Sequence, residues 1–98
     1  LTARITLQEI PIYEGAESLC VAGTRSSIWP ANRAAASIAF RNGDRGDLLF
    51  DPQTAGGLLA ALPPDDTNAV LRTVRDMGHD ARIIGTFESR SEVTVQVD

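Results

Sequence analysis

Residues 48–62 read Leu48-Leu49-Phe50-Asp51-Pro52-Gln53-Thr54-Ala55-Gly56-Gly57-Leu58-Leu59-Ala60-Ala61-Leu62. This stretch constrains the backbone conformation more than an ordinary core segment does. Pro52 fixes its own φ and disfavours helix at Asp51, so the chain must be extended or turn there. The glycine pair allows φ > 0, or a close approach of another group to the bare backbone. The apolar run at residues 58–62 predicts a short buried strand, although so brief a run is also compatible with helix.

Two turns in the chain are candidates for anion binding. A tight turn that enters a core strand, as at residues 51–57, exposes backbone N–H groups to an anion. The alternative is a turn that only joins two elements. The loop Gly23-Thr24-Arg25-Ser26-Ser27 offers backbone donors, hydroxyls and one guanidinium, which suit a phosphate. Its alternative is a hydroxyl-rich loop that caps the next helix. The residues alone leave both choices open.

Length and composition place the chain among ordinary soluble domains. Ninety-eight residues suffice for one domain, and 43% apolar and 22% charged residues are typical of a globular protein. No apolar run approaches the roughly 20 residues that cross a membrane. The single Cys20 excludes an internal disulfide and favours a reducing, cytoplasmic setting.

Charge and residue types exclude several function classes. A net charge of −4 argues against a nucleic-acid partner. All nine basic residues are arginine, so no P-loop lysine, Schiff-base lysine or lysine general base is present. One cysteine and one histidine, His79, cannot complete a zinc site. Asp44 and Asp47 lack the EF-hand spacing and are expected to be solvated loop charges. No metal site or catalytic constellation is predicted.

The hydrophobic pattern predicts an α+β fold in which helices pack on a mixed or antiparallel sheet. Within it, Leu19 and Cys20 should face inward, the last strand should lie near a sheet edge, and Gly85 should mark a bulge or a close contact. Strands are expected at residues 2–10, 58–62, 81–87 and 93–97, helices at 14–21, 31–40 and 65–77, and an exposed loop at 42–47.

The opening stretch resembles a motif of the C-terminal domain of selenide, water dikinase, also called selenophosphate synthetase. Members carry a leucine-rich approach to Asp-Pro-Gln-Thr, a small residue, Gly-Gly and an apolar run, which stand here at residues 48–59, with Ala55 where many members have serine. Ile10-Pro11-Ile12 with Glu14-Gly15-Ala16, and Gly78 with Ala81, Ile83, Ile84 and Gly85, resemble the flanking family segments.

The resemblance implies that residues 1–98 form a partial C-terminal domain of a longer enzyme. Its fold would be like the C-terminal domain of aminoimidazole ribonucleotide synthetase, a partly ferredoxin-like α/β sandwich. Many members have Gly-Thr-Arg followed shortly by asparagine, whereas Gly23-Thr24-Arg25 is followed here only at Asn32. That variant, with Leu49-Phe50 before Asp51, looks more like the subgroup fused behind a flavin-dependent NADH-dehydrogenase-like domain.

The resemblance also implies a function for the parent enzyme. The family converts ATP, selenide and water, with magnesium, into selenophosphate, AMP and orthophosphate. Its catalytic cysteine or selenocysteine, essential lysine and metal-binding aspartates belong to the N-terminal half, so this piece alone is expected to be inactive, to hold no cofactor and to need the missing N-terminal domain as its partner. It would form one wall of the ATP cleft in a cytoplasmic homodimer.

The site residues that the resemblance implies belong to this nucleotide cleft. They are Asp51, Thr54, Gly56 and Gly57, with Thr24 and Arg25 as phosphate neighbours. A second hypothesis is a stand-alone ferredoxin-like module that binds a small molecule or dimerises through a sheet edge at residues 93–97.

Overall fold

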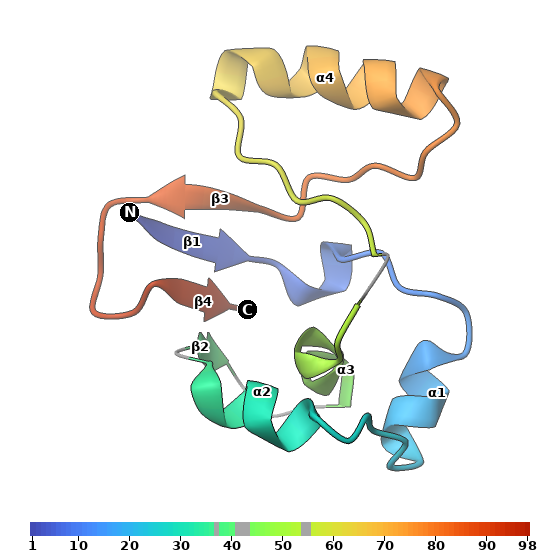
Figure 1. Ribbon diagram of the computed structural model, residues 1–98. Coiled ribbons are helices and arrows are strands. Elements are labelled where there is room, and N and C mark those ends of the chain that lie inside the picture. The colour runs from blue at the N-terminus through green and yellow to red at the C-terminus, as the bar shows by residue number, and fades with distance from the viewer. Residues whose placement is uncertain (37, 41–43, 54–55) are drawn as a thin grey trace.

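A four-stranded mixed sheet forms the centre of the computed structural model, which describes residues 1–36, 38–40, 44–53 and 56–98 (Figure 1). The strands are β1 (Thr2–Ile5), β2 (Ile38–Phe40), β3 (Gly85–Glu88) and β4 (Val95–Val97), and their order is β2-β4-β1-β3. β4 runs parallel to both β1 and β2, while β3 runs antiparallel to β1. The predicted α+β class with a mixed sheet is confirmed.

The N-terminus of β1 is tied to the chain that leads into β4 through a buried hydroxyl. Thr2 is 3% exposed. Its Oγ1 donates to the carbonyl of Val93 at 2.9 Å and accepts from the backbone N–H of Ser91 at 2.8 Å. A buried hydroxyl with both capacities used costs little to bury, so this contact helps to set the register of the sheet.

The expectation that the last strand lies near a sheet edge is wrong. β4 pairs with β1 on one side and β2 on the other, and Val97 is 5% exposed. The alternation of valine with polar residues indicates that the two faces of the strand differ in exposure. It does not report the position of a strand within the sheet, because edge pairing depends on which other segments lie alongside.

The predicted first strand is shorter than expected and is followed by the 3-10 turn η1 (Leu7–Glu9). Helix α1 (Ala16–Val21) confirms the helix predicted at residues 14–21 but begins two residues later. It ends at Gly23, whose φ of 86° is the left-handed conformation that glycine adopts at helix ends. Cys20 is buried as expected, whereas Leu19 is 58% exposed, so its predicted inward orientation is wrong.

The middle of the chain departs most from prediction. The first part of the helix expected at residues 31–40 belongs to α2 (Trp29–Ala35), residue 37 lies outside the described part, and residues 38–40 form strand β2 instead. Of the loop expected at 42–47, residues 42 and 43 lie outside the described part, and the rest is the short helix α3 (Asp44–Asp47), followed by η2 (Leu48–Phe50). Alanine-rich sequence favours helix locally, but pairing with β4 overrides that preference.

The strand expected at residues 58–62 is also wrong. These residues belong to no helix or strand, and Leu58 and Leu59 are 102% and 76% exposed. An apolar run becomes a strand only when a neighbouring strand accepts its hydrogen bonds, and no described segment lies beside it in that way. The strand expected at residues 81–87 is displaced to β3, and Gly85 makes the predicted close contact, since a Cβ there would overlap the backbone carbonyl of Arg4.

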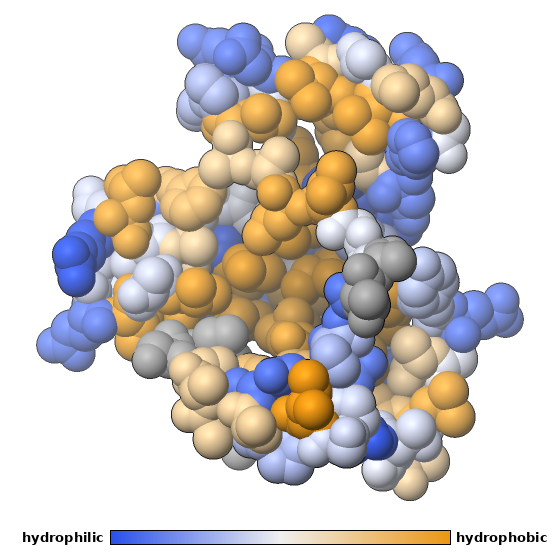
Figure 2. Space-filling view, viewed as in Figure 1, coloured by the Kyte–Doolittle hydropathy of each residue, from blue (hydrophilic) through white to orange (hydrophobic). Residues whose placement is uncertain are grey.

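Helix α4 (Pro64–Asp76) matches the predicted helix closely, with Gly78 at φ 88° after its end. It stands apart from the sheet in Figure 1, and none of its residues is buried. Figure 2 shows apolar side chains gathered around a hollow between α4 and the sheet. The buried apolar side chains of the described residues are Cys20, Phe50 and Val97. Among the described residues, no helix has the length and apolar character to span a bilayer.

Candidate functional site

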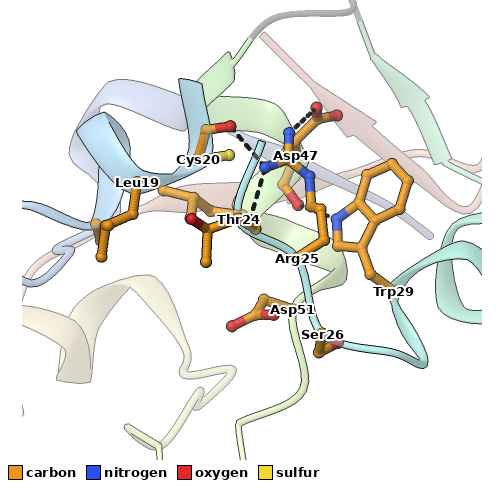
Figure 3. A pocket seen from close by; sticks show the side chains of 10 residues that line it. Leu19, Cys20, Thr24, Arg25, Ser26, Trp29, Asp47 and Asp51 are labelled. Carbon is orange, nitrogen blue, oxygen red and sulfur yellow. Dashed lines mark hydrogen bonds and ion pairs between the residues drawn. The ribbon is translucent and has the colours of Figure 1, made fainter. Parts of the chain in front are cut away.

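A pocket of about 390 Å³ opens where α1 and the loop after it meet α2, η2 and the start of the Asp51 turn (Figure 3). Its walls combine one arginine and two aspartates with apolar and hydroxyl side chains. The lining residues are Ala16, Leu19, Cys20, Thr24, Arg25, Ser26, Trp29, Asp47, Leu48 and Asp51.

Arg25 is the most heavily bonded side chain of the pocket. Its Nη2 pairs with Oδ2 of Asp47 at 2.9 Å, and its Nη1 donates to the carbonyls of Cys20 at 2.6 Å and Thr24 at 2.9 Å. The guanidinium carbon also lies 5.2 Å from the ring centroid of Trp29. Both charged side chains are about a quarter exposed, which strengthens the pair relative to a surface ion pair. The positive charge is therefore already balanced within the wall.

Side chains of α2 hold η2 against the pocket. The indole Nε1 of Trp29 donates to the carbonyl of Asp47 at 2.8 Å, and Nδ2 of Asn32 donates to the carbonyl of Phe50 at 2.9 Å. The rings of Trp29 and Phe50 meet edge to face, with centroids 6.0 Å apart. The guanidinium carbon of Arg33 lies 4.9 Å from the Phe50 ring centroid. Edge-to-face pairs and cation–π contacts each add modest, directional stabilisation.

Three of the predicted site residues are brought together in this pocket. Thr24 and Arg25 come from the loop after α1, and Asp51 comes from the start of the motif, 26 residues beyond Arg25 in the sequence. Asp51 has φ −74° and ψ 131°, the extended conformation expected before proline, and its N–H donates to the carbonyl of Leu48 at 3.2 Å. Figure 3 shows the Asp51 side chain below the Arg25–Asp47 pair.

The structure does not bring the remaining predicted residues into the pocket lining. Thr54 is outside the described part of the chain. Gly56 and Gly57 do not line the pocket. At Gly56 another group does approach the bare backbone closely, as predicted for the glycine pair, because an added Cβ would lie 2.9 Å from Cβ of Gln53. At Gly57 an added Cβ would have no neighbour within 4 Å.

Sequence reasoning missed the contributions of Asp47, Trp29 and Asn32. Asp47 was expected to be a solvated loop charge, but it is the ion-pair partner of Arg25. Arg25 and Asp47 stand 22 residues apart, and no local spacing pairs them. The one sequence signal for this segment is the grouping of an arginine, a tryptophan and an asparagine at residues 25–32, which lies well before the apolar triplet at residues 48–50.

No metal centre is indicated. Within the described ranges, no group of three or more histidine, cysteine, aspartate or glutamate side chains is placed to hold an ion. The expected packing role of Cys20 agrees with its burial. The hydroxyl of Ser26 is buried at the pocket wall, and no residue in the described part of the chain hydrogen-bonds to it.

Comparison with known proteins identifies proteins that are similar to this chain. No family model matches it. It is 34% identical over 90 residues to a selenide, water dikinase of Geobacter sp. (strain M21), covering 90% of this chain and 26% of that protein. It is 38% identical over 85 residues to a selenide, water dikinase of Burkholderia pseudomallei (strain K96243), covering 82% and 24%. A third, from Geobacter metallireducens, is 35% identical over 89 residues, covering 87% and 26%.

The matches span most of this chain but only about a quarter of the length of these curated relatives. They agree with the residue-level resemblance at the Asp-Pro-Gln-Thr stretch, and the α+β fold is compatible with it. Over most of its length, the chain is therefore similar to one segment of the selenide, water dikinases, as the residue-level resemblance implies.

Proposed function

We propose that this chain is the C-terminal part of a selenophosphate synthetase and forms one wall of its ATP cleft. The observation that carries the proposal is the identity of 34–38% to three selenide, water dikinases over 82–90% of the chain. The parent enzyme would use ATP, magnesium, selenide and water to form selenophosphate, AMP and orthophosphate. It would act as a cytoplasmic homodimer, with the N-terminal domain of the same polypeptide as the partner of this segment. Fusion to a flavoprotein domain remains a prediction for the parent.

The pocket supports a place for this segment beside the nucleotide. Thr24, Arg25 and Asp51 converge there, and Gly57 has open space around its backbone. Because Arg25 is already paired with Asp47, we assign it the shaping of the wall rather than the capture of an isolated phosphate. Thr54, Gly56 and Gly57 would continue the wall along the motif. All reacting groups would come from the rest of the enzyme, which accords with the absence of lysine from this sequence.

The alternative of a stand-alone module depended on a free sheet edge at residues 93–97. Residues 93–97 were expected to offer a free sheet edge, but β4 pairs on both sides. The pocket and the similarity to selenide, water dikinases favour a segment of a larger enzyme.

A chimeric enzyme tests the proposal. The matching segment of the Geobacter sp. relative is replaced by residues 1–98 of this chain, and selenophosphate formation from ATP and selenide is followed by ³¹P NMR. The chimera should form selenophosphate, and the 98-residue chain alone should not. Turnover by the isolated chain would overturn the assignment of roles. A folded chimera that binds no ATP, beside an active relative, would contradict the cleft assignment.

A further inference from the structure

The peptide group between Phe50 and Asp51 is held at both ends. Its carbonyl accepts from Nδ2 of Asn32 at 2.9 Å, and its N–H donates to the carbonyl of Leu48 at 3.2 Å. A peptide plane with both polar atoms bonded has little freedom to rotate. This group is the point at which η2 passes into the Asp-Pro turn.

The beginning of η2 is fixed by two other side chains of the same neighbouring segment. Arg25 binds the carboxylate of Asp47, and Trp29 donates to the Asp47 carbonyl at 2.8 Å. Between these anchors, Phe50 is only 3% exposed and packs edge to face on Trp29. Three donors from residues 25–32 therefore hold Asp47 and Phe50, the two ends of the segment 47–50 immediately before the Asp-Pro step.

We infer that Arg25, Trp29 and Asn32 are positioning residues that set the backbone of Asp51 at the start of the motif. We call these three residues the clamp. The clamp joins two sequence features that lie some 20 residues apart, the Gly-Thr-Arg loop with its following helix and the Asp-Pro stretch. None of the three needs to contact a ligand for this role. The consequence for ATP rests on the proposed function, whereas the mechanical role does not.

The mechanical role is tested on the 98-residue chain by ¹⁵N relaxation. Asn32→Asp keeps the size of the side chain but replaces the donor to the Phe50 carbonyl with an acceptor, and Trp29→Phe keeps an aromatic ring but removes the indole N–H. Each variant should lower the amide order parameter of Asp51 from a rigid value of about 0.85 toward 0.6 or below. The amides of Ile5 in β1 and Val97 in β4 should keep their values, and Asn68→Asp on the exposed α4 should change none of these.

An unchanged Asp51 order parameter in both variants would overturn the inference. Equal losses at Ile5 and Val97 would also overturn it, because the contacts would then serve the whole fold rather than this turn. If Asn32→Asp does not fold, the milder Trp29→Phe variant decides the outcome.

The chimeric enzyme separates this inference from the proposed function. Asn32→Asp in the chimera should raise the KM for ATP several-fold, with a smaller effect on kcat, because the cleft wall is displaced while the reacting groups remain in place. If the Asp51 order parameter falls and the KM for ATP does not change, the positioning role of the clamp is supported and the cleft assignment is contradicted. If the Asp51 order parameter is unchanged, the positioning role of the clamp is contradicted, regardless of the KM for ATP.

Discussion

At the scale of single residues, the two neighbouring glycines of the motif differ in what they tolerate. An added Cβ at Gly56 would lie 2.6 Å from Oε1 and 2.9 Å from Cβ of Gln53, whereas one at Gly57 would have nothing within 4 Å. Gly56→Val should therefore displace Gln53 and, in the chimeric enzyme, reduce kcat/KM for ATP by at least tenfold without unfolding the protein. Gly57→Ala is the matched control for crowding by a Cβ and should leave the Gln53 contacts unchanged. Wild-type kinetics in folded Gly56→Val would contradict the importance of the turn.

Arg45 is a residue whose importance is structural. Its Nε donates to the carbonyl of Leu7 at 3.1 Å and its Nη2 to the carbonyl of Ile10 at 2.7 Å, and its side chain is only 17% exposed. Arg45→Met keeps the apolar stem but leaves these carbonyls without their charged donor. The free energy of unfolding should fall by about 1–3 kcal/mol. Urea denaturation with an unchanged m-value checks this.

The control for Arg45 is Arg72→Met on the exposed face of α4, which should change the free energy of unfolding by no more than about 0.5 kcal/mol. Equal effects of the two substitutions would show that the carbonyl contacts add nothing beyond a surface charge.

At the scale of elements, α4 is a regular helix with weak tertiary support. Leu71 and Val74 are half-buried, while Val70 and Met77 on the same stripe are 39% and 69% exposed. Helices of this length owe most of their stability to packing. Native-state hydrogen exchange should therefore show the amides of α4 opening at a lower free energy than those of β1 and β4. Protection of α4 equal to that of the central strands would mean that the helix has a packing partner in solution.

At the scale of the whole molecule, the amount of exposed apolar surface predicts self-association of the isolated chain. Leu58, Leu59 and Phe87 are 102%, 76% and 57% exposed, and Figure 2 shows apolar side chains around the hollow beneath α4. Large contiguous apolar patches are rare on monomeric proteins. Size-exclusion chromatography should show earlier elution as the concentration rises.

A double substitution, Leu58→Ser with Leu59→Ser, should reduce this self-association. Tyr13→Ser provides the control, because Tyr13 is similarly exposed at 87% but precedes α1, far along the chain from these leucines. A clean monomer at high concentration would refute the prediction.

The sequence alone determined the features that depend on neighbouring residues. The helical period accounts for the apolar stripe of α4. The conformational freedom of glycine accounts for the chain reversals at Gly23 and Gly78 and the close contact at Gly85. Proline geometry accounts for the extended backbone of Asp51. The same local order of residues carried the family resemblance. The α+β class followed from the alternation of such segments.

Only the tertiary structure decided what depends on partners distant in sequence. Residues 38–40 are a strand and not helix because β4 lies beside them, and β4 is an inner strand because β1 and β2 flank it. The ion pair between Arg25 and Asp47 and the hydrogen bond from Asn32 to the Phe50 carbonyl are equally non-local. Hydrogen bonds and ion pairs across such separations form when the chain folds back on itself, and no spacing within a short window encodes them.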